Sequence, residues 1–180
     1  TETGLEKEYS DFFSQEAEKQ YWMKLVDLAY DIHDALLILN EGDAKASVKN
    51  IYKRKSIYLA ETGHDLSVQR NIIKRELQRH GYIVLPKNTL PSHVSEVTRI
   101  VRKDLEECSL SVHLVGSAYG EIPEGGDRSI VDIQNQLAAE MALEKKQNKQ
   151  EFSRLIWISQ NLKNASDKQR SFIDTLKRDT

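Results

Sequence analysis

The chain has few of the features that mark secreted, membrane or nucleic-acid-binding proteins. Its one cysteine, Cys108, leaves no internal disulfide to form, which favours a reducing compartment and therefore the cytoplasm. No apolar run reaches the ~18 residues that span a bilayer, and no signal peptide is recognisable, so no membrane partner is expected. The net charge of −2, with acids and bases interspersed, excludes a general nucleic-acid binder.

Motifs for metal or phosphate chemistry are also absent from the sequence. Its five histidines are scattered and form no paired metal-ligand spacing, so no metal site is predicted. There is no Walker loop, no GxGxxG after the first predicted strand and no nucleophile elbow. The first predicted strand ends instead in residues 60–65, which argues against an ordinary dinucleotide fold.

Residues 10–39 carry a long helical pattern. The apolar residues that recur at three- and four-residue steps are Phe13, Ala17, Tyr21, Leu25, Leu28, Ile32, Ala35 and Leu39. A second stripe widens the apolar face, so this helix needs two partners, and self-association through helices is one way to supply them. The polar residues 40–47 read as a linker. We therefore divide the chain into residues 1–50, a long N-terminal helix and linker, and residues 51–180. Both ends suggest a piece of a larger parent protein.

After the linker, short apolar segments alternate with helical patterns. Strands are expected over residues 56–60, 82–85, 110–115 and 153–158, and helices over 65–80, 94–108 and 130–146, with a last helical pattern around Phe172. This alternation predicts an α/β fold with a parallel sheet flanked by helices. In such sheets ligands bind beyond the carboxyl ends of the strands, where the chain direction switches.

The first predicted strand leads into a loop with candidate binding residues. Ala60 ends the strand, Glu61 follows it, and Asp65 is expected to cap the next helix. Arg70 stands one turn into that helix, where it can pair with Asp65 or Glu61 or reach a phosphate of a ligand.

The loop after the third predicted strand contains four of the eight glycines. Gly120 permits close approach of the backbone, and Tyr119 offers an aromatic face. Ser129 can cap the following helix, whose apolar stripe faces the sheet. Asp132, Gln136 and Glu140 form a polar ridge beside that stripe, and the helix start favours an anion. Whether Tyr119 packs or binds, and whether the ridge is solvated or lines a site, stays open from the residues alone.

Four segments carry a likeness to a known group: "SIYLAETGHDLSVQR", "HGYIVLP", "LSVHLVGSAYGEIPEGGDRSIVDIQNQLAAE" and "SRLIWIS". From Lys55 to about Leu176 the chain resembles the TIR-like (Toll/interleukin-1 receptor-like) domains of bacterial conflict and antiphage proteins. DUF4062-type domains and nucleoside deoxyribosyltransferases belong to the wider group. The resemblance implies a flavodoxin-like sheet of order 2-1-3-4-5, whose fifth strand would lie near or beyond residue 180.

The resemblance also implies two kinds of function. Some TIR domains cleave the nicotinamide–ribose bond of NAD, and others only self-associate and recruit partners. In the first case NAD is a substrate, no cofactor is required, and a glutamate on the third helix steadies the transition state. Here Gln136 precedes Leu137 where the family has glutamate, and Gln134 is the other match. Asp132 lies one turn earlier and can substitute.

The expected roles follow from this resemblance. Glu61 and Arg70, with Ala60, would hold the ribose or phosphate end of NAD or a related nucleotide. Tyr119 and Gly120 would form a wall, and Ser129 and Asp132 would face the scissile ribose. Because a neutral amide cannot stabilise developing positive charge as a carboxylate does, Gln136 favours a binding wall over a catalytic one. The alternatives are a non-catalytic self-association module and a nucleoside deoxyribosyltransferase-like enzyme.

Overall fold

The computed structural model describes residues 55–178 and six positions nearer the N-terminus, Tyr21, Leu25, Leu28, Ala29, Ile32 and Leu36. The chain divides into two units, Thr1–Lys53 and Arg54–Thr180. The six positions are helical, as the apolar pattern predicts. The remainder of the predicted N-terminal helix and the predicted linker lie outside the described residues.

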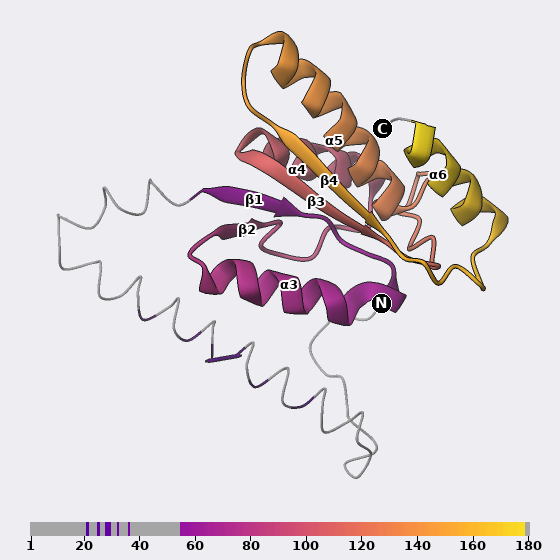
Figure 1. The fold of residues 1–180 in the computed structure, drawn as a ribbon, viewed down its shortest axis with the longest axis horizontal. Coiled ribbons are helices and arrows are strands. Elements are labelled where there is room, and N and C mark those ends of the chain that lie inside the picture. Colours follow the sequence, from indigo (N-terminus) through magenta and orange to yellow (C-terminus); the bar gives the residue numbers. More distant parts are fainter. Residues whose placement is uncertain are drawn as a thin grey trace. The chain divides into compact units, whose positions relative to one another are not determined.

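Residues 55–178 form a parallel sheet with helices on both faces (Figure 1). The elements in chain order are β1 (Ser56–Leu59), η1 (His64–Leu66), α3 (Ser67–Arg79), β2 (Ile83–Leu85), α4 (Val94–Glu106), β3 (Cys108–Val115), α5 (Ile130–Gln147), β4 (Ser153–Ile158) and α6 (Asp167–Arg178). The strand order is β2-β1-β3-β4. The predicted α/β class is confirmed, and the order agrees with the first four strands of a flavodoxin-like sheet. A fifth strand is not among the described residues.

Cys108 belongs to a different element from the one its sequence position suggested. It opens β3 instead of ending the preceding helix, because α4 stops at Glu106. Its side chain is buried, as expected of a small apolar residue, and burial raises the pKa of its thiol to about 12. A thiol held protonated in this way is a packing group and a poor nucleophile.

The strand register assigns each side chain to a face of the sheet. Tyr58 pairs with Leu85 of β2 and with Ser111 of β3, and Leu59 pairs with Val112. Since paired residues of parallel strands share a face, Tyr58 and Ser111 point to one side and Leu59 to the other. The first side packs against α4 and α5, and α6 extends this layer beside β4. The second side packs against α3.

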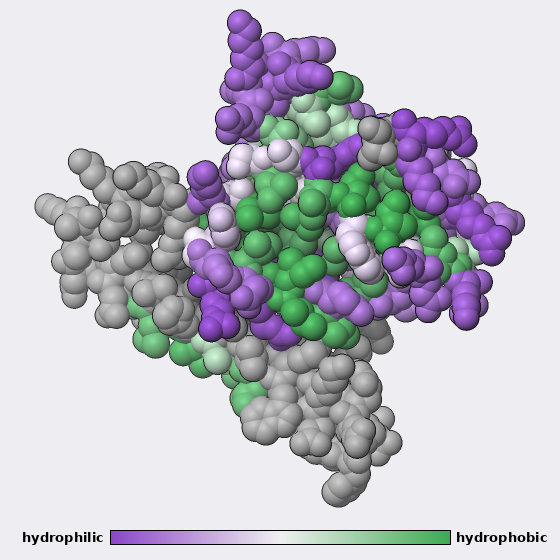
Figure 2. All heavy atoms as spheres, in the orientation of Figure 1, coloured by the Kyte–Doolittle hydropathy of each residue, from purple (hydrophilic) through white to green (hydrophobic). Residues whose placement is uncertain are grey.

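α3 covers only part of its face. Its Ile73 and Leu77 pack on β1, β2 and Val112 of β3, whereas the outer strand β4 presents Leu155 and Trp157 with 55% and 47% of their surface exposed. Figure 2 shows hydrophobic side chains gathered in the middle of the face that this view presents. The described part of the chain therefore leaves apolar surface on β4 uncovered.

Candidate functional site

The loops that follow β1, β3 and β4 enclose a hollow of about 570 Å³ at the carboxyl ends of these strands. We call it the switch-point hollow, because α3 and α5 leave the neighbouring strands β1 and β3 toward opposite faces of the sheet. This is where parallel α/β sheets bind ligands. It is lined by Thr62, Gly63, His64, Ser117, Ala118, Tyr119, Gly120, Glu121, Asn164 and Ser166.

Asp65 fastens the floor of this hollow instead of capping a helix. Its Oδ2 accepts hydrogen bonds from the backbone N–H of Ser117 (2.7 Å), the Ser117 hydroxyl (3.0 Å) and the backbone N–H of Ala118 (3.2 Å). Its Oδ1 is buried and has no partner among the described residues. The predicted capping role is wrong, because α3 begins at Ser67 with no side-chain cap. Asp65 thus joins the β1 loop to the β3 loop.

Three predicted binding residues after β1 make internal contacts. Arg70 donates from Nε to the Ala60 carbonyl (2.8 Å) and from Nη2 to the Leu59 carbonyl (3.0 Å), so it holds the end of β1. Of the two predicted acidic partners, Glu61 acts electrostatically on Arg70. Burial lowers the pKa of the Arg70 guanidinium. The Glu61 carboxylate accepts the backbone N–H of Leu90 (3.1 Å). Ala60, Glu61 and Arg70 lie beside the hollow without lining it.

Gln134 is fully buried and clamps the same loop from the other side of the sheet. Its Oε1 accepts from the Tyr58 hydroxyl and from the Glu61 N–H, both at 2.8 Å. Its Nε2 donates to the carbonyls of Glu61 (3.1 Å) and Ile130 (3.0 Å). With both amide protons and the oxygen used, this side chain is a structural clamp and presents nothing to a ligand.

Tyr119 bridges the β3 loop to the start of α5. Its hydroxyl donates to Asp132 Oδ2 (2.9 Å), and its ring meets Phe172 of α6 edge-on, with centroids 6.3 Å apart. Burial and the bond to Asp132 raise the pKa of Tyr119. Ser129 is buried and caps α5, as predicted, by accepting the Asp132 N–H (3.2 Å). Gly120 has a φ of 89°, which a side chain would strain.

The predicted polar ridge on α5 divides between two neighbours. Asp132 binds Tyr119, whereas Gln136 is exposed, accepts from Arg128 and donates to Glu140 Oε1 (3.0 Å). Glu140 in turn pairs with Arg102 of α4 at 2.8 Å. Gln136 and Glu140 therefore line the groove between α4 and α5, outside the switch-point hollow. Neither Gln134 nor Gln136 lines that hollow.

A second, smaller hollow of about 300 Å³ adjoins the first. It lies between the start of α5 and α6, and its lining residues are Tyr119, Asp127, Arg128, Asp132, Lys168, Ser171, Phe172 and Thr175. We call it the α5–α6 hollow. Tyr119 lines both hollows.

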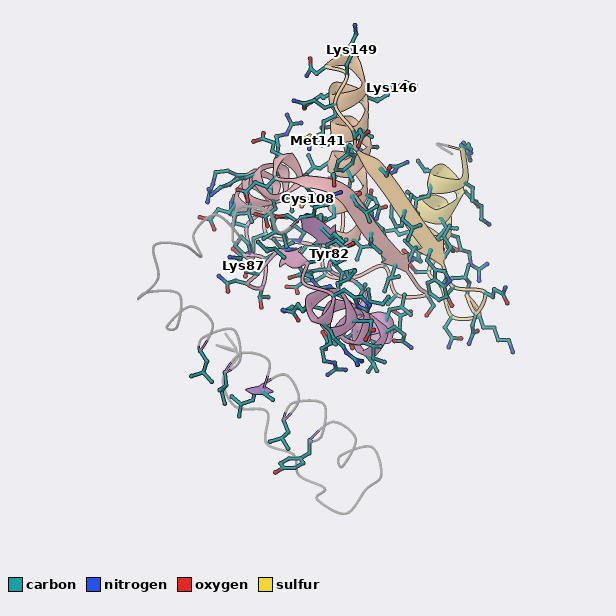
Figure 3. The ribbon with its side chains drawn as sticks, turned by 60° about the vertical axis from the view of Figure 1, so that its left-hand side comes forward. Tyr82, Lys87, Cys108, Met141, Lys146 and Lys149 are labelled. Atoms are coloured by element: carbon teal, nitrogen blue, oxygen red, sulfur yellow. The ribbon has the colours of Figure 1, made fainter. Side chains whose placement is uncertain are left out.

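A larger hollow of about 680 Å³ lies at the opposite, amino end of the strands, beside Ser109, Lys146 and Phe152. Figure 3 shows Lys146 and Lys149 at that end of α5, with Met141 nearer the middle of the helix. Size alone would favour this hollow. However, it lacks the convergent loops and helix starts of the carboxyl ends, so the switch-point hollow is the better candidate.

Sequence patterns missed the contribution of α6. Gln169 is fully buried and donates from Nε2 to the Gly116 carbonyl (2.6 Å), which positions the start of the β3 loop. Asn164 and Ser166, just before α6, line the hollow. The one signal in the sequence that could have indicated these residues is that they follow the fourth predicted strand, where a loop at the carboxyl edge of the sheet is expected.

Among the described residues, no group of three or more histidine, cysteine, aspartate or glutamate side chains is placed to hold a metal ion. Within the same part of the chain, no helix has the length and apolar character required to cross a membrane. No family model, curated protein or solved structure matches this chain.

Proposed function

We propose that residues 55–178 form a TIR-like domain that binds NAD or a related nucleotide in the switch-point hollow. Its role would be that of a cytoplasmic effector or signalling module of a bacterial defence protein. The observation that carries this proposal is the position of the hollow. Two of the segments that resemble TIR-like domains supply eight of its ten lining residues, Thr62–His64 and 117–121.

Binding is better supported than cleavage. The side-chain amide of Gln134 is hydrogen-bonded to Tyr58, Glu61 and Ile130, and Gln136 lies in the α4–α5 groove. Of the predicted catalytic residues, only Asp132 stands beside the hollow, and its carboxylate already accepts the Tyr119 hydroxyl. A carboxylate occupied in this way must first be released before it can stabilise an oxocarbenium-like charge.

Filling the switch-point hollow with a large side chain tests this proposal. Thr62→Trp places an indole in the switch-point hollow, and Thr89→Trp, at an exposed position after β2, is the matched control. Calorimetric titration of the full chain with NAD should give binding that Thr62→Trp abolishes and Thr89→Trp preserves. Equal binding by both variants, or none by the unaltered chain, would refute the proposal. Nicotinamide release, followed by chromatography, reports cleavage separately.

The uncovered surface on β4 favours a second function, non-catalytic self-association. Edge strands are usually protected by lysines, prolines or bulges. β4 has none of these: its one charged side chain, Arg154, donates inward to the Asn135 carbonyl (3.3 Å). Together with Leu155 and Trp157, this edge offers a surface for assembly.

A further inference from the structure

The switch-point hollow has an acid in its lining and no lysine or arginine. The acid is the exposed Glu121, and a histidine, His64, also lines the hollow. A second carboxylate, that of Asp65, lies under the floor, with its buried Oδ1 so close to Gly63 that a Cβ there would be 2.8 Å away. A phosphate inside this hollow would have the Glu121 carboxylate among its neighbours and no lysine or arginine as a partner.

The α5–α6 hollow has the cations that the switch-point hollow lacks. Arg128 and the exposed Lys168 line it, together with Asp127 and Asp132. Its charges balance, and the Asp132 carboxylate is turned to the Tyr119 hydroxyl. Of the two adjoining hollows, this one offers partners for an anion.

The polar groups of the switch-point hollow suit a sugar. Hydroxyl or amide side chains come from Thr62, Ser117, Asn164 and Ser166. Ser117 donates its hydroxyl proton to Asp65 and can still accept, and the Ser166 hydroxyl accepts from the Gln169 N–H and can still donate, so all four side chains can bond ribose hydroxyls. Tyr119 adds an aromatic edge for a base. The Glu121 carboxylate further favours a base that carries positive charge, such as the pyridinium ring of oxidised nicotinamide nucleosides.

We propose that the switch-point hollow takes the nucleoside end of its ligand, a ribose with a neutral or cationic base, and excludes phosphate. The phosphate groups lie across Tyr119, beside Arg128 and Lys168. This inference rests on the proposed function and adds the direction in which a dinucleotide lies on the domain.

Titration calorimetry of the full chain with NAD and with nicotinamide riboside tests this direction. Lys168→Ala should weaken NAD binding about three- to tenfold and leave the phosphate-free riboside within about twofold. Lys163→Ala is the matched control, because Lys163 is an exposed lysine in the loop just before α6, the helix that carries Lys168, and lines neither hollow. Glu121→Gln should weaken both ligands, since both place the same cationic nucleoside beside Glu121.

The outcomes separate this inference from the proposed function. If NAD binds and Lys168→Ala changes neither ligand or both equally, the direction is wrong and nucleotide binding stands. If Glu121→Gln tightens NAD, phosphate occupies the switch-point hollow and the inference is overturned. If neither ligand binds the unaltered chain, the proposed function and the inference are both refuted.

Discussion

The side-chain amide of Gln134 pairs with both polar backbone groups of Glu61, accepting its N–H at 2.8 Å and donating to its carbonyl at 3.1 Å. This is a two-point bond between α5 and the loop after β1. Since Glu61 also holds the N–H of Leu90, the clamp extends to the loop after β2. Three segments at the carboxyl edge of the sheet thus depend on one buried glutamine.

Replacement of Gln134 should therefore be costly. Gln134→Ala leaves the Tyr58 hydroxyl and the Glu61 N–H without their acceptor, and each buried group left unpaired costs about 1–3 kcal/mol. We expect the free energy of unfolding to fall by ~2–4 kcal/mol in urea titrations. Gln136→Ala, on the same helix but exposed, should change it by less than about 0.5 kcal/mol. Similar losses in both variants would contradict the clamp.

The bond between Tyr119 and Asp132 predicts a response to alkaline pH. Since the pKa of Tyr119 is raised in the folded state, the unfolded chain loses this proton first. The contribution of the protonated Tyr119 to the free energy of unfolding is complete below about pH 10, the ordinary tyrosine pKa. It is lost as the pH rises toward the pKa that Tyr119 has in the folded state. Tyr119→Phe should reduce the alkaline loss of stability, measured by urea midpoints between pH 8 and 11. The exposed Tyr82→Phe is the control, and the two profiles should differ.

His113 predicts a response to acid. Burial, with a smaller effect from Arg154, lowers the pKa of this fully buried imidazole to about 3. A histidine in the unfolded chain takes up its proton near pH 6.5. The stability that the neutral His113 contributes is therefore fully present above that pH and is lost as the pH falls toward 3. The difference in unfolding free energy between the unaltered chain and His113→Leu should fall by at most ~1.4 kcal/mol per pH unit in this window.

The matched control for that measurement is His80→Gln, at the exposed end of α3. The difference curves of the two variants should differ between pH 6.5 and 4.5. At pH 7.5 the His113→Leu variant should lose no hydrogen bond and no stability from that source, because neither ring nitrogen of His113 has a partner among the described residues. A flat acid profile for His113→Leu would show that the imidazole is accessible to water.

Trp157 tests the assembly function. If β4 mediates self-association, Trp157→Lys should lower the weight-average mass of the full chain in sedimentation at high concentration. Leu143→Lys is the control, since Leu143 is 63% exposed on α5, away from β4. A chain that is monomeric at every concentration, or that responds equally to both changes, would argue against assembly through β4.

Much of the fold was available from local pattern. Strands over residues 56–59, 83–85 and 153–158 and the stripe of Ile130, Ile133, Leu137 and Met141 follow from apolar spacing, because burial of one face fixes the period. The rule for parallel sheets then located the hollow at the carboxyl ends before any contact was known. Ser129 as a cap is equally local, since it bonds three residues ahead.

The partners of the polar residues were decided by the tertiary structure alone. Asp65 and Ser117 are 52 positions apart, and Gln134 and Glu61 are 73 apart, so no local period relates them. A loop carboxylate or a helix amide bonds whatever the fold brings within about 3 Å, and a buried one must find such a partner. For that reason the sequence by itself determined the sheet and the edge that carries the hollow. Only the packing of α3, α5 and α6 on the sheet decided that Arg70 and Gln134 hold the loop beside the hollow, and that Tyr119 lines both this hollow and its neighbour.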